Sequence, residues 1–525
     1  MHDRPVTAVW EITMGCNMRC KHCGSSCTQP LPDELTHDEA IALCDDIADL
    51  GLEWITLSGG EPLTRKDWPA LVRRLRERGV IPNVITNGWM CTEAVIETAR
   101  EAGVGTFAIS LDGLHQTHDD IRKARSFERS TGALATMAAK GVAAGVITTV
   151  NKRNIGELDG LHQLLLGLGV TNWQLQIGLP MGNLNDPHNR AMVMDPEQVE
   201  GLIDFIHARS TDERMSIYPA DCLGYHSRKE IECRTRAHRS AEPLVWMGCN
   251  AWQRSFGILH NGDILGCTSV RDRSFVEGSI RKRPLKDIWY DPECFTWNRR
   301  ITKNKLGEQC GSCRYGDTCR GGCPNTRLTM EGTIYADNSY CVYALGLKRA
   351  RARIAEVTET SQLPELALSL IDKGENQLAG LVLERIIEDA PDDTDALSRY
   401  GYVSYTLSNF DRARWANEQV LKLRPGDLYA TKGLGVVLNA LGEPEQAIAC
   451  LRQAVAMAAG QDPDAYHDLA AVYMQNGMHD EARAVLDQAE KQGYHLVDID
   501  PARAPEPIGQ RPGYAPGSYG GNRAG

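Results

Sequence analysis

The sequence lacks any apolar run long enough to span a lipid bilayer, and its opening residues, Met-His-Asp-Arg-Pro, lack the apolar core of a secretion signal. A membrane-spanning helix needs about 20 predominantly apolar residues in a row, and a secretion signal needs a shorter apolar run near its start. These absences predict a cytoplasmic protein with no membrane partner. The 17 cysteines are then expected to be reduced thiols, because the cytosol keeps thiols reduced.

The chain also has fewer basic than acidic residues, 57 Lys and Arg against 69 Asp and Glu. The formal net charge is -12 at pH 7, and phosphate binding needs clustered Lys and Arg, so no nucleic-acid partner is expected. Aromatic residues make up only 6% of the chain, but an apolar fraction of 42% over 525 residues is ample for several hydrophobic cores. Beyond residue 341 only Cys450 remains of the cysteines. This shift in composition indicates a second, different domain.

Three cysteines, Cys16, Cys20 and Cys23, lie within eight residues, just after an apolar stretch that predicts a strand over residues 8–13. Iron-sulfur clusters are normally held by four cysteines, so a loop with three predicts a cubane cluster whose fourth iron binds something exchangeable. A zinc site is the alternative for clustered thiols.

The spacing C-x3-C-x2-C resembles the radical S-adenosylmethionine (SAM) superfamily. The resemblance implies a [4Fe-4S] cluster whose open iron chelates the amino and carboxylate groups of SAM, and a reductant such as flavodoxin or ferredoxin. One electron then cleaves SAM to a 5′-deoxyadenosyl radical, which abstracts an unactivated hydrogen. His22 matches the family position that packs on the adenine ring.

A second motif, Gly59-Gly60-Glu61-Pro62, follows an expected strand over residues 54–58. Its glycines are expected to expose backbone groups to a close ligand, and its carboxylate can face an ammonium group. In the family this motif receives the amino group of the SAM methionine, so Gly59, Gly60, Glu61 and Pro62 are assigned to the cofactor.

Short β-branched runs alternate with amphipathic ones along the first 180 residues. The sequence predicts strands over residues 8–13, 54–58, 81–85, 106–111, 146–150 and 173–178. The first intervening helix has a capping box, Thr36 with Glu39. Six βα units predict an α/β fold, a partial (β/α)6 barrel with its chemistry at one set of strand ends.

Polar side chains follow three of these strands. They come from Thr86-Asn87-Gly88, Ser110-Leu-Asp112-Gly113 and Thr148-Thr-Val-Asn151. In the family, residues at these strand ends contact the ribose and the carboxylate of SAM, so Asn87, Ser110, Asp112 and Asn151 are assigned to the cofactor. Turn capping is the alternative role for each of them.

Seven further cysteines follow in a set order: Cys249, Cys267, Cys310, Cys313, Cys319, Cys323 and Cys341. This order resembles a SPASM domain, which carries two auxiliary iron-sulfur clusters beside the active site. By this resemblance the first auxiliary set is Cys249, Cys267 and Cys323, and the second auxiliary set is Cys310, Cys313, Cys319 and Cys341. A zinc ribbon is the alternative for the C-x2-C pair of the second set.

The first auxiliary set lacks a fourth cysteine, because the run after Cys249 has no thiol where some relatives supply one. Either an open iron binds substrate, or Cys222 or Cys233 completes the set, with Cys294 as a weaker candidate. The sequence leaves these alternatives open.

Thr268 directly follows the second SPASM cysteine, where sulfatase-maturing relatives carry an aspartate that acts as a base. A neutral hydroxyl cannot replace a carboxylate base at ordinary pH, which disfavours sulfatase maturation. Asp263 and Asp272 lie near in sequence but fall in turn-like, solvated segments. No catalytic acid or base is assigned beyond the cluster.

From about residue 360 an alanine- and leucine-rich helical pattern repeats. Landmark pairs recur at intervals of 34, 34 and 35 residues: Leu366-Ala367, Tyr400-Gly401, Leu434-Gly435 and Leu469-Ala470. This period predicts four tetratricopeptide-like repeats. Such arrays stack helix pairs into a superhelix with a concave face suited to extended peptides or partner helices, although a rigid spacer or a dimer contact is an alternative role.

The expected domains are therefore a radical SAM core over residues 1–210, a SPASM domain with its bridging region over 211–350, four repeats over 351–500 and a tail over 501–525. The tail is rich in proline and glycine and is expected to be disordered.

The resemblance to SPASM enzymes implies oxidoreductase-like modification of a ribosomally made peptide by crosslinking, oxidation or epimerisation. The expected partner is a precursor peptide held by the repeats. No winged-helix module precedes the first strand, so the repeats or a separate leader-recognition protein would bind the leader. The alternatives are maturation of a small cofactor of tetrapyrrole or quinone type, oxidation of a protein side chain, and a non-catalytic adaptor.

Overall fold

The computed structural model describes residues 4–494, so the tail predicted over 501–525 lies outside the described residues. The chain divides into two compact units. Unit 1 comprises residues up to 311 together with 315–345, and unit 2 comprises residues from 346 onward together with 312–314. Within 4–494, no helix is both long enough and apolar enough to cross a membrane.

Unit 1 is built on a single ten-stranded sheet with the order β10-β9-β8-β1-β2-β3-β4-β5-β6-β7. The strands are β1 (Thr7–Thr13), β2 (Trp54–Gly59), β3 (Ile81–Thr86), β4 (Phe107–Ser110), β5 (Ala144–Val150), β6 (Asn172–Ile177), β7 (Ser216–Pro219), β8 (Ser255–Ile258), β9 (Asp263–Leu265) and β10 (Val276–Ser279). Neighbouring strands from β1 to β7 are parallel. Their carboxyl ends therefore meet at one edge of the sheet.

The predicted partial (β/α)6 barrel is confirmed, and β1 to β6 match the six expected strands. The sheet is larger than expected at both ends. β7 adds a seventh parallel strand next to β6, and β8 pairs in parallel with β1. β8, β9 and β10 form an antiparallel extension from the SPASM segment. The cysteine pattern that identifies this segment carries no information about strand pairing, so the sequence did not predict it.

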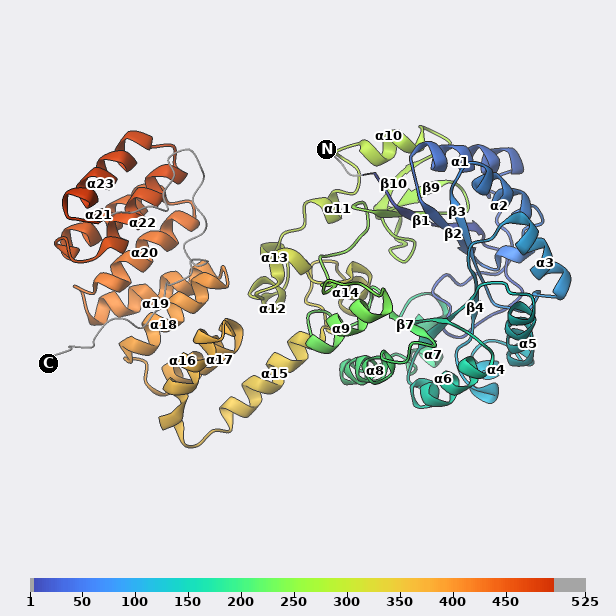
Figure 1. The fold of residues 1–525 in the computed structure, drawn as a ribbon, viewed down its shortest axis with the longest axis horizontal. Helices are drawn as coiled ribbons and strands as arrows, with labels where there is room; N and C mark the ends of the chain where they lie inside the picture. The colour runs from blue at the N-terminus through green and yellow to red at the C-terminus, as the bar shows by residue number, and fades with distance from the viewer. Residues whose placement is uncertain (1–3, 495–525) are drawn as a thin grey trace. The chain divides into compact units, whose positions relative to one another are not determined.

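The helices of unit 1 cover the sheet (Figure 1). The longer ones are α1 (His37–Asp49), α2 (Trp68–Glu77), α3 (Glu93–Ala102), α4 (His115–Ile121), α5 (Ser126–Ala139), α6 (Leu158–Gly167), α8 (Pro196–Arg209) and α9 (Arg228–Ala237). Shorter ones are α7 (Pro187–Arg190), α10 (Leu285–Tyr290), α11 (Thr296–Arg299), α12 (Glu308–Gly311), α13 (Gly316–Cys319) and α14 (Pro324–Glu331). The capping box of Thr36 and Glu39 is present at the start of α1.

The core of unit 1 lies between the sheet and these helices. Trp10 on β1 and Trp173 on β6 are fully buried, as are Ala40, Leu43, Cys44 and Ile47 on α1. Burying such side chains stabilises the fold by about 1.5–3 kcal/mol each for the larger ones. The packed core holds the strand ends in a fixed arrangement and so defines the geometry of the site.

Unit 2 begins within α15 (Val342–Ala355), which spans the division, and continues as four helix pairs. The pairs are α16 (Leu363–Asp372) with α17 (Asn376–Asp389), α18 (Thr394–Thr406) with α19 (Phe410–Leu423), α20 (Leu428–Ala440) with α21 (Pro444–Ala458), and α22 (Pro463–Gln475) with α23 (His479–Lys491). They stack in chain order (Figure 1). The four landmark pairs fall on the first helix of each pair, and the repeats are confirmed.

Small residues explain how tightly the helices of each pair approach. Ala379, Ala413, Ala447 and Ala482 occupy one equivalent position near the start of the second helices, and each is at most 1% exposed. A larger side chain there would separate the two helices, which is why the repeat keeps alanine in phase.

A buried ion pair links the last two repeats. Lys432 on α20 places Nζ 2.7 Å from Oδ2 of Asp462, the N-cap residue of α22, and the two side chains are 3% and 5% exposed. Lys432→Met is expected to lower the free energy of unfolding of the repeats by about 3–5 kcal/mol, because it removes the cation beside a buried carboxylate. Urea unfolding of the full chain, followed by helical circular dichroism, measures this. Lys422→Met on the exposed face of α19 is the matched control, and equal loss in both variants would contradict the prediction.

Candidate active site

The cysteine loop leaves the carboxyl end of β1 and brings its three thiols together. Cys20 lies close enough to Cys16 and Cys23 for each thiolate to raise its pKa. Burial is the larger effect and raises the pKa of Cys20 to about 12, which Arg122 partly offsets. One buried and two half-buried thiols, whose thiolate forms repel one another, have the donor set and the electrostatic need of an iron-sulfur cluster. The residues present therefore fit that group.

Cys27 is a fourth thiol in this loop that sequence reasoning missed. It is 4% exposed, and its thiol donates a hydrogen bond that, as the largest effect, lowers the pKa of Cys23 to about 5. The pKa of Cys27 is raised in turn, and its thiol also donates to Met14 Sδ at 3.9 Å. The signal was its own spacing, four residues beyond Cys23. Hydrogen bonds to ligand sulfurs are one of the means by which proteins tune cluster potentials.

The two glycines that follow β2 admit the backbone of the cysteine loop. A Cβ at Gly59 would lie 2.3 Å from the Thr13 carbonyl oxygen, and one at Gly60 would lie 2.2 Å from that of Gly15. The Gly60 N–H donates to Thr13 O at 2.8 Å, and the Glu61 N–H donates to Gly15 O at 2.8 Å. The sequence attributed these glycines to a close ligand, whereas here the close neighbour is the chain itself.

Gly60→Ala is expected to displace the cysteine loop, because its new methyl group would overlap the Gly15 carbonyl. The cost is about 1–3 kcal/mol of stability, as for overpacking elsewhere, together with a loss of bound iron. Iron content and thermal unfolding of the anaerobically purified chain measure the two effects. Gly132→Ala on α5 is the control, since no atom lies within 4 Å of its added Cβ. Wild-type iron content in Gly60→Ala would contradict the prediction.

Glu61 is fully buried behind the cysteine loop. Its carboxylate accepts hydrogen bonds from Thr86 Oγ1 at 2.7 Å, from the Asn87 N–H at 2.7 Å and from the Leu63 N–H at 3.2 Å. Burial nevertheless raises the pKa of the carboxyl group. A buried carboxylate in this state gains most from a bound cation, and an ammonium group is of the right charge.

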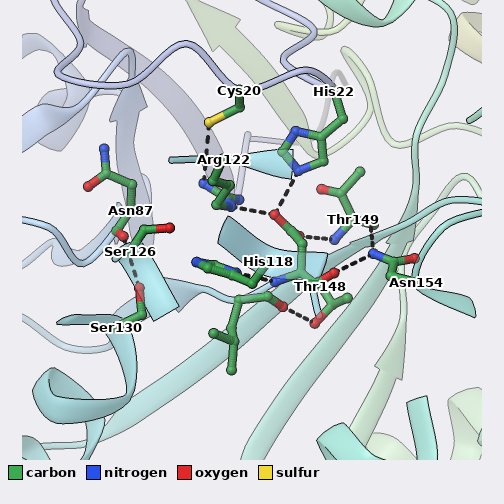
Figure 2. A network of polar contacts seen from close by, with 12 residues as sticks. Cys20, His22, Asn87, His118, Arg122, Ser126, Ser130, Thr148, Thr149 and Asn154 are labelled. Atoms are coloured by element: carbon green, nitrogen blue, oxygen red, sulfur yellow. Dashed lines mark hydrogen bonds and ion pairs between the residues drawn. The ribbon is translucent and has the colours of Figure 1, made fainter. Parts of the chain in front are cut away.

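Asp112 is the centre of a second buried network, and Figure 2 labels its partners His22, Arg122 and Thr149. Its Oδ2 lies 2.7 Å from His22 Nε2 and also accepts a hydrogen bond from Arg122 Nε, while Oδ1 accepts from the Thr149 N–H at 2.7 Å. Burial alone would raise the pKa of Asp112, but Arg122 and His22 outweigh it and hold the pKa below its usual range. Asp112 thus fixes the orientation of two side chains next to the cysteines.

The other predicted cofactor residues lie at the same edge of the sheet. Asn87 donates from Nδ2 to Asn17 Oδ1 at 2.7 Å, within the cysteine loop. Ser110 ends β4 and is 9% exposed. Asn151 is fully buried and accepts from the Arg153 N–H at 2.9 Å through Oδ1, as a turn-capping residue does. The assignment of all three to the cofactor stays a prediction.

Arg122 and His118 are site residues that sequence reasoning missed. Arg122 Nη1 lies 4.0 Å from Cys20 Sγ, so one guanidinium contacts both a cluster cysteine and Asp112. His118, one helical turn earlier, accepts from the Asp112 N–H through Nδ1 at 3.0 Å, and burial lowers its pKa to about 4. The available signal was the i, i+4 spacing of a His and an Arg on the helix that follows Ser110-Leu-Asp112-Gly113.

The first auxiliary set is brought together in unit 1. Cys249 lies close enough to Cys323 and Cys267 for their thiolates to raise its pKa, in addition to the larger effect of burial. In the second auxiliary set, Cys319 packs against Tyr225 and Trp246, with Cys341 at the edge of the same cluster. Cys310 is buried, and its N–H donates to Asp337 Oδ1 at 2.7 Å. Cys313 belongs to the short segment 312–314 that groups with unit 2.

Within residues 4–494, no three His, Cys, Asp or Glu side chains converge on a point where they could hold a single metal ion. The thiolates of a cubane bind different irons and so lie farther apart than the ligands of one ion, such as the four of a zinc site.

The parallel, barrel-like sheet gathers three thiols and a buried carboxylate at its strand ends. This arrangement is typical of one class of protein, the SAM-dependent radical enzymes. Comparison with family models agrees. The Radical SAM superfamily model matches residues 10–165, the iron-sulfur cluster-binding SPASM domain matches 249–314, and tetratricopeptide repeat models match 365–428, 405–461 and 438–495. The chain is therefore a radical SAM enzyme with a SPASM domain and tetratricopeptide repeats, and its cofactors are SAM and iron-sulfur clusters.

Similar proteins of known activity fall into two groups. The chain is 28% identical over 359 residues to the AdoMet-dependent heme synthase of Methanosarcina barkeri, covering 66% of this chain and 99% of that protein. It is 27% identical over 350 residues to the mycofactocin maturase MftC of Mycobacterium tuberculosis, covering 65% and 83%. These alignments leave about a third of the chain unmatched.

Solved structures share the fold. Streptococcus suis SuiB bound to precursor peptide SuiA superposes with a TM-score of 0.51 at 18% identity, covering 64% of this chain and 76% of that one. The enzyme anSMEcpe with bound AdoMet and the Cp18Cys peptide gives a TM-score of 0.52 at 16% identity, covering 66% and 97%. At these identities the likeness establishes the fold and nothing finer.

Proposed function

We propose that this chain is a maturase that modifies a ribosomally synthesised peptide. The single observation that carries the proposal is the joining of a radical SAM and SPASM unit to a four-repeat solenoid in one chain. Solenoids of this type present a long concave surface that suits an extended peptide. A small substrate would need no such surface.

The cluster and SAM, when bound, supply a 5′-deoxyadenosyl radical that abstracts a substrate hydrogen. Cys16, Cys20 and Cys23 hold the cluster. The Glu61 carboxylate, oriented by Thr86 and by the backbone after β3, pairs with the SAM ammonium group. This pairing offsets the free-energy cost of burying the Glu61 carboxylate, the same burial that raises its pKa.

The network around Asp112 positions the remaining groups. Asp112 holds His22 Nε2 at 2.7 Å, which fixes the imidazole plane that faces the adenine. Asn87 and Ser110 offer polar groups to the ribose and the methionine carboxylate, while Asn151 shapes the turn after β5. The choice of substrate hydrogen belongs to the geometry with which the substrate is held, because the radical itself is unselective.

Maturation of a small cofactor is the second candidate. It is favoured by the several similar proteins named heme synthases, and by one named Fe-coproporphyrin III synthase that is 26% identical over 360 residues. In that case the repeats would bind a partner protein rather than the substrate.

Anaerobic co-expression with the peptide encoded by a short open reading frame beside the gene tests the proposal. Mass spectrometry should find the peptide two hydrogens lighter for a crosslink or a desaturation, or one deuteron heavier after expression in deuterated water for an epimerisation. Cys16→Ala supplies the inactive control. An unchanged peptide, together with SAM cleavage and a mass change in Fe-coproporphyrin III, would contradict the peptide proposal and support the second candidate.

A further inference from the structure

A fourth thiol faces the first auxiliary set. Cys222 lies close enough to Cys323 for the two thiolates to repel each other, and its sulfur accepts a hydrogen bond from the Ile177 N–H at the carboxyl end of β6. Cys249 and Cys267 also face Cys323. Cys222, Cys249 and Cys267 therefore all lie near Cys323 in unit 1.

The loop that carries Cys222 is held in an unusual conformation. Gly224, Tyr225 and His226 have φ angles of +80°, +114° and +55° in succession. Non-glycine residues rarely adopt such angles, and they keep them only where surrounding contacts impose them. The chain thus turns back on itself directly after Cys222.

Tyr225 ties this loop to the turn that carries Cys323. Its hydroxyl donates to the Asp221 carbonyl at 3.0 Å and accepts from the Cys323 N–H at 3.0 Å. Its ring packs so closely that a Cβ on Gly322 would lie 2.6 Å from it. A single side chain therefore fixes the residue before Cys222 and the backbone of Cys323 with respect to each other.

Arg234 clamps the same loop from α9. Its guanidinium donates to carbonyl oxygens on both sides of Cys222, to Ala220 at 3.3 Å and to Leu223 at 2.8 Å. Glu230 forms a buried ion pair with Arg234 and accepts from the His226 N–H at 3.0 Å. The buried Glu230–Arg234 ion pair and the strained turn thus fix the position of the Cys222 thiol.

The other two candidate cysteines point elsewhere. Cys233 on α9 donates to the Ile203 carbonyl at 3.9 Å, and the groups that influence its pKa, after burial, are charged side chains of its own helix. Cys294 donates to the Glu277 carbonyl at 3.3 Å and accepts from Arg283 Nη2 at 2.8 Å. Within residues 4–494, neither Cys233 nor Cys294 forms a hydrogen bond with a cysteine of the first auxiliary set.

We propose that Cys222 is the fourth ligand of the first auxiliary cluster. Each iron of that cubane then has a protein thiolate, and no substrate atom binds iron there. The proposal rests on the cofactor content of the chain and holds for a peptide or a small substrate alike. It assigns the first auxiliary cluster to electron transfer and leaves substrate binding to protein side chains.

Loss of iron on mild oxidation tests the proposal in the full-length holoprotein, because a cubane with three thiolates sheds its unligated iron. The wild type and the Cys233→Ala control are expected to lose about one iron per chain, from the SAM-binding cluster, and Cys222→Ala to lose about two. Electron paramagnetic resonance should show the additional three-iron signal only in Cys222→Ala. Equal iron loss and identical spectra in the two variants would overturn the proposal.

Cys222→Ser covers the case in which the alanine variant does not fold. A serine oxygen can still bind iron, so this variant is expected to keep its iron count but to shift the spectrum of one reduced cluster. If Cys222 only packs against Cys323, the spectrum of Cys222→Ser will equal that of the wild type, and the proposal is wrong.

Discussion

Cys16→Ala is expected to reduce 5′-deoxyadenosine formation to background under anaerobic, reducing conditions. Two thiolates cannot hold a cubane, and without it SAM has neither an iron to chelate nor an electron to accept. The other clusters should remain, since their cysteines lie elsewhere in the chain. Chromatographic quantitation of 5′-deoxyadenosine, with iron content measured on the same sample, tests both statements.

Cys450→Ala is the matched control, because this thiol lies half-buried on α21 in unit 2. Cys27 provides a sharper one, since its thiol contacts Cys23 and could replace a lost ligand. Retained activity in Cys16→Ala that disappears in Cys16→Ala/Cys27→Ala would show that the assignment of the three ligands is wrong. If 5′-deoxyadenosine formation is lost in Cys16→Ala while the function of the protein in the cell is unchanged, the non-catalytic adaptor is supported.

Arg122→Met is expected to lower the free energy of unfolding by about 3–5 kcal/mol at pH 7, because it leaves the fully buried Asp112 without its strongest cationic partner. Arg122 also faces Cys20, so the variant should hold less iron. Urea unfolding and iron analysis measure these effects. Arg73→Met on the exposed side of α2 is the control, and a similar loss of stability there would contradict the prediction.

The pH dependence of Arg122→Met has a defined sign. In the wild type the pKa of Asp112 is held below its usual range, so its contribution to stability is present above the unfolded pKa of about 3.9 and is lost as pH falls through the folded value. In the variant, burial raises that pKa, and protonation relieves the cost as pH falls. The difference in free energy of unfolding between Arg122→Met and the wild type should therefore become smaller from pH 7 toward pH 5.

Local patterns explain why so much of this molecule follows from its sequence. The strands and the cysteine loop follow from hydrophobic period and spacing, and the repeats follow from a 34-residue period that fixes each helix pair on its neighbour. Glu61 was found because its motif is contiguous. Each of these signals lies within one element or one repeat.

The remainder of the site depends on contacts between distant segments. Arg122 contacts Cys20 across 102 positions, and Tyr225 contacts Cys323 across 98. No local pattern reports such pairs. The close approach of Gly60 to Gly15 likewise arises only in the tertiary structure, and it gives the glycine a packing role, while its expected contact with the ligand stays a prediction. Asp112 was located correctly by its strand end, but its partners could be found only in three dimensions.

The parallel pairing of β8 with β1 has a consequence for how this chain can be divided. β1 would otherwise be an edge strand with exposed hydrogen-bonding groups, which is a template for self-association. A shortened chain ending after β7 would uncover that edge immediately beside the cysteine loop. The SPASM segment therefore covers an otherwise open edge of the barrel sheet in addition to carrying cysteines.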